Sequence, residues 1–294
     1  MKTGCAVFLA SFFAFGASWF GFVYGPIHQL GVEKQTAVLQ SGDNWPLQRT
    51  GEATLGLQVY RANGCAACHT EQVRQTGMTS EISLISLGGY KAADFKEFIQ
   101  SLMIVPELMN SSNIIVGNLD NWNGQVPVTL YSGGDSAVVS SLADKLKPAG
   151  VKTDARLVAT GADISRGWGL RQSVAADYLY DVPVQLGSLR AGPDLTMVGV
   201  REPDLNWQLQ HLYAPRSLVK DSTMPAFRYL FEVRKIGAQP APDALALPKD
   251  FAPADGMEVV PTTEARELAA YLMSLKVNQP LYEAPFTPVT AAKQ

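Results

Sequence analysis

The chain has 294 residues, of which 47% are hydrophobic and 17% are charged, and its formal net charge is −3. A nucleic-acid-binding protein would carry a basic patch, so this charge balance gives no support to a nucleic-acid partner. The length suits one large domain or two modest ones, and three cysteines are too few for a disulfide framework.

Residues 1–25 are predicted to form a membrane anchor. No charged residue lies between Lys2 and Glu33, and the apolar stretch over residues 4–24 is long enough to span a bilayer as a helix. Aromatic residues gather at the end of this stretch, where a membrane interface would lie. The Gly25-Pro26 pair is expected to end the helix.

Two interpretations of this apolar segment compete. It is either an anchor that stays in place or a signal peptide that is cleaved within residues 14–17. The anchor is favoured because the apolar run continues for several residues beyond that region. Lys2 would then stay in the cytoplasm and the remaining chain would lie outside it. Cys5 lies inside the run and is expected to be a small buried hydrophobic residue.

The segment after the anchor is predicted to be an extended polar leader over residues 27–49, followed by a helix over residues 53–63. Gly56 and Tyr60 lie four residues apart in that helix and therefore share one face. Gly64 is expected to end the helix immediately before a pair of cysteines.

The run Cys65-Ala66-Ala67-Cys68-His69 has the C-x-x-C-H spacing of a covalent haem c site. The two thiols can reach the vinyl groups on one edge of the ring, and His69 can supply the proximal nitrogen to iron. The alternatives are a thiol redox pair and half of a zinc site. Cys5 is the one other cysteine, which excludes a four-cysteine zinc site, and a redox pair would follow a strand.

We therefore predict one covalent haem c, attached through Cys65 and Cys68 with His69 as a metal ligand. Because c-type haem is attached in the bacterial periplasm, the expected location is the bacterial inner membrane, with a single span and the haem domain in the periplasm.

Residues 79–159 differ in their sequence pattern from the flanking chain and are predicted to form a small inserted α/β module. Helices are expected over residues 92–108 and 136–147, and Gly133-Gly134-Asp135 resembles a helix cap more than a phosphate loop. The expected strands cover residues 114–116, 126–131 and 156–159.

The chain beyond the module is predicted to contain a short helix over residues 205–212, a surface loop over 238–261 and a final helix that ends near Leu275. Residues 284–294 are expected to be a tail. The apolar face of the final helix is predicted to consist of Leu268, Tyr271, Leu272 and Leu275.

The sixth iron ligand must reach the haem from the side opposite His69. Met224 is the leading candidate, since it precedes the final helix and Pro225 restricts its backbone. His211 and Met257 are alternatives. A histidine–methionine pair fills both axial positions and raises the potential relative to two histidines, which favours electron transfer over chemistry at the iron.

In their order along the chain, these motifs resemble the membrane-anchored mono-haem subunit, subunit II, of cbb3-type haem–copper cytochrome c oxidases. Two departures are present: Gln75 stands where that family usually has proline, and the family has no module of this size after Arg74. The shared positions are Arg74, Arg190–Leu195, His211–Arg216 and Met224–Phe227.

The resemblance implies a mainly α fold in which a class I cytochrome c domain over residues 26–78 and 160–283 follows the anchor and carries the insertion. It also implies that the carbonyl of Pro193 accepts a hydrogen bond from the second ring nitrogen of His69. Arg190 would suit a haem propionate.

The function implied is that of an electron-transfer subunit of a terminal oxidase in aerobic respiration, with no catalytic residue of its own. Its partners would be the catalytic haem–copper subunit, a further c-type cytochrome subunit and membrane lipid. Alternatives are a free-standing membrane-anchored cytochrome that shuttles electrons, and a haem sensor or peroxidase with an open sixth position.

Overall fold

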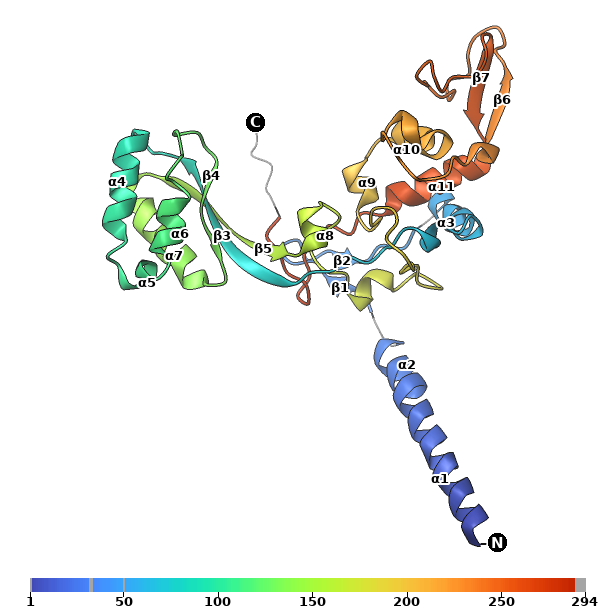
Figure 1. Ribbon diagram of the computed structural model, residues 1–294, viewed down its shortest axis with the longest axis horizontal. Helices are drawn as coiled ribbons and strands as arrows, with labels where there is room; N and C mark the ends of the chain where they lie inside the picture. The colour runs from blue at the N-terminus through green and yellow to red at the C-terminus, as the bar shows by residue number, and fades with distance from the viewer. Residues whose placement is uncertain (1, 32–33, 50, 289–294) are drawn as a thin grey trace.

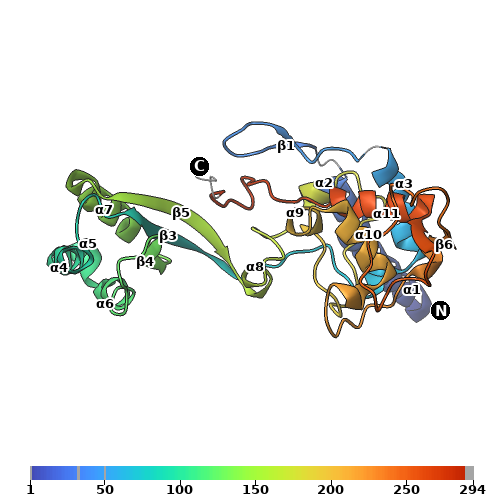
Figure 2. The same ribbon diagram turned by 90° about the horizontal axis from the view of Figure 1, so that it is seen from above.

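The computed structural model describes residues 2–31, 34–49 and 51–288. Figure 1 shows a long N-terminal helix below a central body, and an α/β unit that two long strands carry away from that body. Figure 2 shows the same separation from above. The described chain combines helices with three small sheets, so it is a mixed helix-and-sheet protein and not a mainly α one.

The N-terminal helix consists of α1 (Lys2–Trp19), a π-helical turn (Phe20–Tyr24) and α2 (Gly25–Leu30). Among the described residues one helical segment, Thr3–Gln29, is long and apolar enough to cross a membrane, with a mean hydropathy of 1.8. At about 1.5 Å per residue these 27 residues exceed the hydrocarbon thickness of about 30 Å. The segment is a candidate membrane anchor.

Two sequence expectations for this segment are wrong. The helix does not end at Gly25-Pro26: proline lies in the first turn of α2, where a missing N–H costs no helical hydrogen bond, and the π turn precedes it. Cys5 is exposed and not buried, because the helix packs against no other part of the described chain.

The central body is built around α3 (Glu52–Ala62) and α11 (Thr263–Ser274), which pack against each other. Gly56 lies at their closest approach: a Cβ atom there would lie 1.8 Å from the carbonyl oxygen of Glu267. One turn further along, the rings of Tyr60 and Tyr271 lie 5.1 Å apart. The shared face predicted for Gly56 and Tyr60 is therefore confirmed as the helix contact.

The helix predictions for this body are accurate to within about a residue. The hydroxyl of Thr262 accepts a hydrogen bond from the N–H of Ala265 at 3.3 Å, which caps α11. Two further helices, α9 (Val198–Arg201) and α10 (Leu205–Tyr213), also contact α11. All four residues predicted for the apolar face of α11 are buried: Leu268, Tyr271, Leu272 and Leu275.

The loop predicted for residues 238–261 is wrong at its end. Strand β7 (Met257–Pro261) pairs with β6 (Phe231–Lys235) in an antiparallel hairpin. Val259 and Val260 are buried there, and the Arg234–Glu258 ion pair joins the strands at 2.9 Å. A five-residue strand carries too short an alternation to be recognised in sequence.

The predicted extended leader folds back as a small hairpin of β1 (Thr36–Ala37) and β2 (Asn44–Trp45). The chain that follows α11 runs along this hairpin, where Leu39 donates its N–H to the carbonyl of Pro280 at 2.8 Å. Leader and C-terminal segment therefore lie side by side.

The α/β unit has a three-stranded antiparallel sheet in the order β4-β3-β5. Its strands are β3 (Gly77–Ser86), β4 (Val128–Gly133) and β5 (Lys152–Thr160). Its core is formed by apolar side chains of this unit alone. The helices over the sheet are α4 (Ala92–Leu102), α5 (Pro106–Met109), α6 (Ser112–Gly117) and α7 (Ser136–Leu146).

Three details of the module differ from expectation. The strand predicted at residues 114–116 is helix α6, which buries Ile115 in the module core and leaves Ile114 exposed. The helix predicted over 92–108 breaks before Pro106. The long strand β3 was not predicted. The expected helix cap is confirmed: Asp135 accepts a hydrogen bond from the N–H of Ala137 at 2.9 Å.

Candidate functional site

The C-x-x-C-H run lies in a tight turn directly after α3. Gly64 adopts a left-handed conformation with φ of 65°, which redirects the chain into a 3-10 turn over Cys65–Ala67. The N–H of His69 then donates to the carbonyl of Cys65 at 3.0 Å. Cys65 and Cys68 are both free thiols. The turn thus presents two thiols and an imidazole within five residues.

The imidazole of His69 is held by the Gly192-Pro193 turn. Its Nδ1 lies 2.8 Å from the carbonyl oxygen of Pro193. A Cβ atom on Gly192 would lie 2.2 Å from Cε1 of His69, so only glycine lets the ring lie this close to the backbone. Burial lowers the pKa of His69, which favours the neutral ring. Because Nδ1 of the neutral ring is directed to Pro193, Nε2 remains available to bind a metal.

Asp194 fixes this turn against the residues that follow His69. Its Oδ2 accepts hydrogen bonds from the hydroxyl of Thr70 at 2.6 Å and from the N–H of Gln72 at 2.8 Å. Its Oδ1 accepts from the N–H of Thr196 at 2.9 Å. Asp194 is fully buried, so these bonds satisfy a charge that would otherwise be costly. The sequence motif included Asp194, but its role was not foreseen.

Arg190 is bound within the protein. Its guanidinium pairs with Asp163 and donates to the carbonyl of Gln72, which uses both terminal nitrogens. Asp163 is buried and also accepts the N–H of Arg74 at 2.7 Å. Of the three guanidinium nitrogens of Arg190, Nε alone has no partner among the described residues. The Arg190–Asp163 pair was not foreseen, because nothing in sequence marks Asp163.

Met224, the first candidate for a sixth ligand, is half-buried beside the core of the body. Its loop is tied to α10, since the N–H of Phe227 donates to the carbonyl of Leu212 at 2.9 Å. Met257, the second alternative, instead begins strand β7 of the hairpin.

His211 stacks on Trp207 with ring centroids 4.7 Å apart and planes 6° apart. Its Nδ1 is buried and has no partner among the described residues. Burial, and to a smaller extent the proximity of His69, lowers the pKa of His211 to about 4. His211 is therefore a neutral ring near His69 that is packed flat on tryptophan.

A buried carboxyl group lies two residues beyond His69. The hydroxyl of Tyr271 donates to the carboxyl group of Glu71 and lies 2.9 Å from each of its two oxygens. Burial raises the pKa of Glu71 to about 8, whereas Arg49 acts in the opposite direction. Burial and the charge of Glu71 also raise the pKa values of Tyr60 and Tyr271. This cluster joins α3, the segment after the C-x-x-C-H run and α11, and no pattern in the sequence indicates it.

In the described ranges (2–31, 34–49 and 51–288), no three or more His, Cys, Asp or Glu side chains gather as a metal-binding group. The residues that the structure does bring together are one imidazole, two thiols and the Gly192-Pro193 turn.

Residues 162–252 match the sequence model of a family described as the cytochrome c oxidase mono-heme subunit, FixO. The chain resembles this oxidase subunit. The matched region contains the Arg190–Leu195, His211–Arg216 and Met224–Phe227 motifs, but it is less than a third of the chain and excludes the C-x-x-C-H run. No curated protein matches the chain.

Proposed function

We propose that this chain is the electron-transfer subunit of a cbb3-type cytochrome c oxidase and carries one covalent haem c. The observation that carries the proposal is the 2.8 Å contact between Nδ1 of His69 and the carbonyl of Pro193, beside two free thiols. It supports the proposal because an orienting acceptor on one ring nitrogen is what a metal-binding histidine requires.

In this proposal Cys65 and Cys68 hold the haem through thioether bonds, His69 supplies Nε2, and Met224 supplies the sixth ligand. Pro193 sets the tautomer and orientation of His69, and burial keeps its ring neutral and able to bind metal. Haem bound in this way would carry one electron, between ferric and ferrous iron.

Unpartnered polar atoms also fit a haem. Within the part of the chain that the structure describes, three buried side-chain nitrogens have no hydrogen-bond partner. Two of them belong to Arg201, which lowers the pKa of His69, and to His211, whose own pKa is lowered by the proximity of His69. A propionate would accept hydrogen bonds from such donors. The three atoms are Nε of Arg190, Nη1 of Arg201 and Nδ1 of His211.

The proposed setting is the bacterial inner membrane, with Thr3–Gln29 as the single span and the haem domain in the periplasm. The partners would be the catalytic haem–copper subunit and a further c-type cytochrome subunit. The chain itself would be non-catalytic, with both axial positions of its iron filled.

The haem assignment is tested on the purified, denatured polypeptide. Covalent attachment predicts that the mass increases by one haem and that the haem absorbance stays with the unfolded chain. Replacing Cys65 and Cys68 with alanine should abolish both signals. A chain matured in a periplasm-competent host that carries no covalent haem would contradict the proposal.

Carbon monoxide distinguishes electron transfer from the sensor or peroxidase alternative. With His69 and Met224 both bound, the reduced protein should not bind carbon monoxide. Ready binding by the unmodified chain would favour the alternative with an open sixth position.

A further inference from the structure

The segment of residues 180–189 has an inverted distribution of side chains. Its polar residues Asp181 and Gln185 are buried, whereas the apolar residues between and around them face outward. No charged residue lies between Asp181 and Arg190. The exposed fractions are 39% for Tyr180, 83% for Val182, 42% for Val184, 40% for Leu186 and 62% for Leu189.

This 180–189 loop is fixed in place. Asp181 pairs with Arg49, and the amide of Gln185 donates to the carbonyl of Pro183 at 2.7 Å. The polar side chains thus have partners inside the protein, whereas the apolar side chains leave between 39% and 83% of their surface exposed. Five large apolar side chains exposed within ten residues indicate an interaction site.

The loop is bonded directly to the C-x-x-C-H run. The N–H of Ser188 donates to the carbonyl of Ala66 at 2.8 Å, and the N–H of Glu71 donates to the carbonyl of Leu186 at 3.2 Å. Between these bonds, a Cβ atom on Gly187 would lie 2.2 Å from the carbonyl oxygen of His69. The loop therefore forms an outer layer over residues 65–69, the proposed haem-attachment turn, with no other segment between them.

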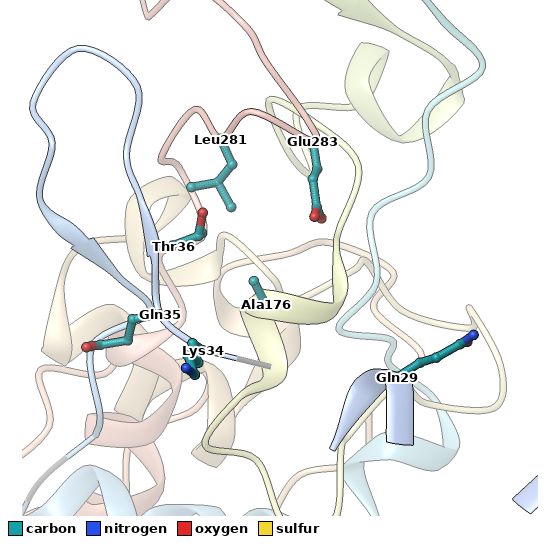
Figure 3. Close-up of a pocket in the computed structure, with 7 residues that line it drawn as sticks. All are labelled: Gln29, Lys34, Gln35, Thr36, Ala176, Leu281 and Glu283. Atoms are coloured by element: carbon teal, nitrogen blue, oxygen red, sulfur yellow. The ribbon is translucent and has the colours of Figure 1, made fainter. Parts of the chain in front are cut away.

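The loop also follows an element that adjoins the end of the membrane helix. The short 3-10 helix Ala175–Tyr178 immediately precedes it. A cavity of about 300 Å³ is lined by Ala176 together with Gln29, the last residue of the membrane segment, and Lys34 (Figure 3). In Figure 1 the chain near this 3-10 helix lies on the side of the body from which α2 leaves.

We infer that the 180–189 loop is the docking face for the membrane-embedded catalytic subunit, an inference that rests on the proposed function. The occupant is an uncharged, apolar patch on the extracytoplasmic surface of that subunit. A lipid surface fits less well, because segments that lie on membranes combine apolar with basic residues and this stretch has no Lys or Arg. Docking here brings the partner against the loop that covers the haem-attachment turn.

The test uses the full chain in its complex, isolated in mild detergent from membranes of a host that makes the whole oxidase. Val182→Lys combined with Leu189→Lys places two charges on the face. Ile104→Lys in the module, at 80% exposure, is the matched control. The double variant should keep covalent haem and the unaltered optical spectrum but recover at least tenfold less b-type haem and copper, whereas the control should match the parent chain.

Conservative changes at the same positions, Val182→Ile with Leu189→Met, should recover the partner at the parental level. A lysine double variant that recovers as much b-type haem and copper as the parent would overturn the docking face and leave the proposed function standing. A parent chain that recovers neither would overturn the proposed function itself.

Discussion

At the scale of single residues, the proposed haem site depends on how the imidazole of His69 is held. Its Nδ1 is directed to the Pro193 carbonyl, and Gly192 leaves room for the ring on the side of the turn. The buried Asp194 then locks the turn to the backbone beyond His69. Because Nδ1 is directed to Pro193, Nε2 is the ring nitrogen that remains available to a metal.

Met224→Ala tests the sixth ligand. Because Cys65 and Cys68 are unchanged, covalent haem should be retained. Loss of the thioether should lower the midpoint potential, abolish the weak sulfur-to-iron charge-transfer band and let the reduced protein bind carbon monoxide. His211→Ala should do none of these. The ligand assignment is wrong if the band survives in the Met224 variant and disappears in Met257→Ala.

His211 gives a prediction about pH. Its pKa is lowered to about 4 in the folded protein, against about 6.5 in an unfolded chain. Between these values the unfolded chain binds a proton that the folded protein does not. The free energy of unfolding should therefore have its full value above about pH 6.5 and should decrease toward pH 4, by at most about 3 kcal/mol.

Urea unfolding of the parent and His211→Phe at pH 7 and pH 5 measures this effect. Phenylalanine keeps a flat ring against Trp207 but cannot titrate. The parent should lose more stability than the variant on acidification. Equal losses would show that His211 does not titrate in this range.

At the scale of elements, a buried ion pair joins three segments that are distant in sequence. Arg171 and Asp177 are both buried and are connected by bonds of 2.7 and 2.8 Å. The indole N–H of Trp45 donates to Asp177 at 2.7 Å, and Arg171 donates to the carbonyl of Gln279 at 2.6 Å. The leader, the 171–177 turn and the C-terminal segment therefore share one charged junction.

Arg171→Met should lower the free energy of unfolding by about 3–5 kcal/mol, because it leaves the buried Asp177 carboxylate without its partner. Arg266→Met is the control: its pair with Asp243 is largely exposed and should contribute less than about 1 kcal/mol. Denaturant midpoints of the haem-loaded proteins measure both. Equal effects would contradict the importance of burial at this junction.

The elements that sequence predicted well have strong local signals. Helix α11 has a threonine cap and a four-residue apolar face, and the C-x-x-C-H spacing is read directly from the chain. What was missed depends on distant contacts. Glu71 meets Tyr271 200 positions later, and Arg74 meets Asp163 89 positions later. Such partners carry no periodicity, so only the folded chain brings them together.

At the scale of the whole molecule, the module has a core of its own and connects to the body through two adjacent strand ends. Gly77 in β3 is paired with Thr160 in β5, and Thr76 donates its N–H to the Thr160 carbonyl at 2.7 Å. A side contact is made by the C-terminal segment, where Thr287 donates its N–H to the carbonyl of Leu157 at 2.9 Å.

Because these strand ends are adjacent, residues 79–159 should be removable with a short flexible linker. The shortened chain should acquire covalent haem with an unchanged optical spectrum, since no residue of the proposed haem site lies in the module. Loss of haem attachment would show that the module is part of the core of the body. Normal haem with lost oxidase assembly would assign the module a docking role.

Purification of the tagged chain from its native membranes in mild detergent shows whether it is an electron-transfer subunit of an oxidase. Metal analysis and reduced-minus-oxidised spectra then measure copper and b-type haem against haem c. Copper and b-type haem should co-purify at a fixed ratio to haem c. A chain that carries haem c but recovers neither would contradict this role and establish a free-standing membrane-anchored cytochrome.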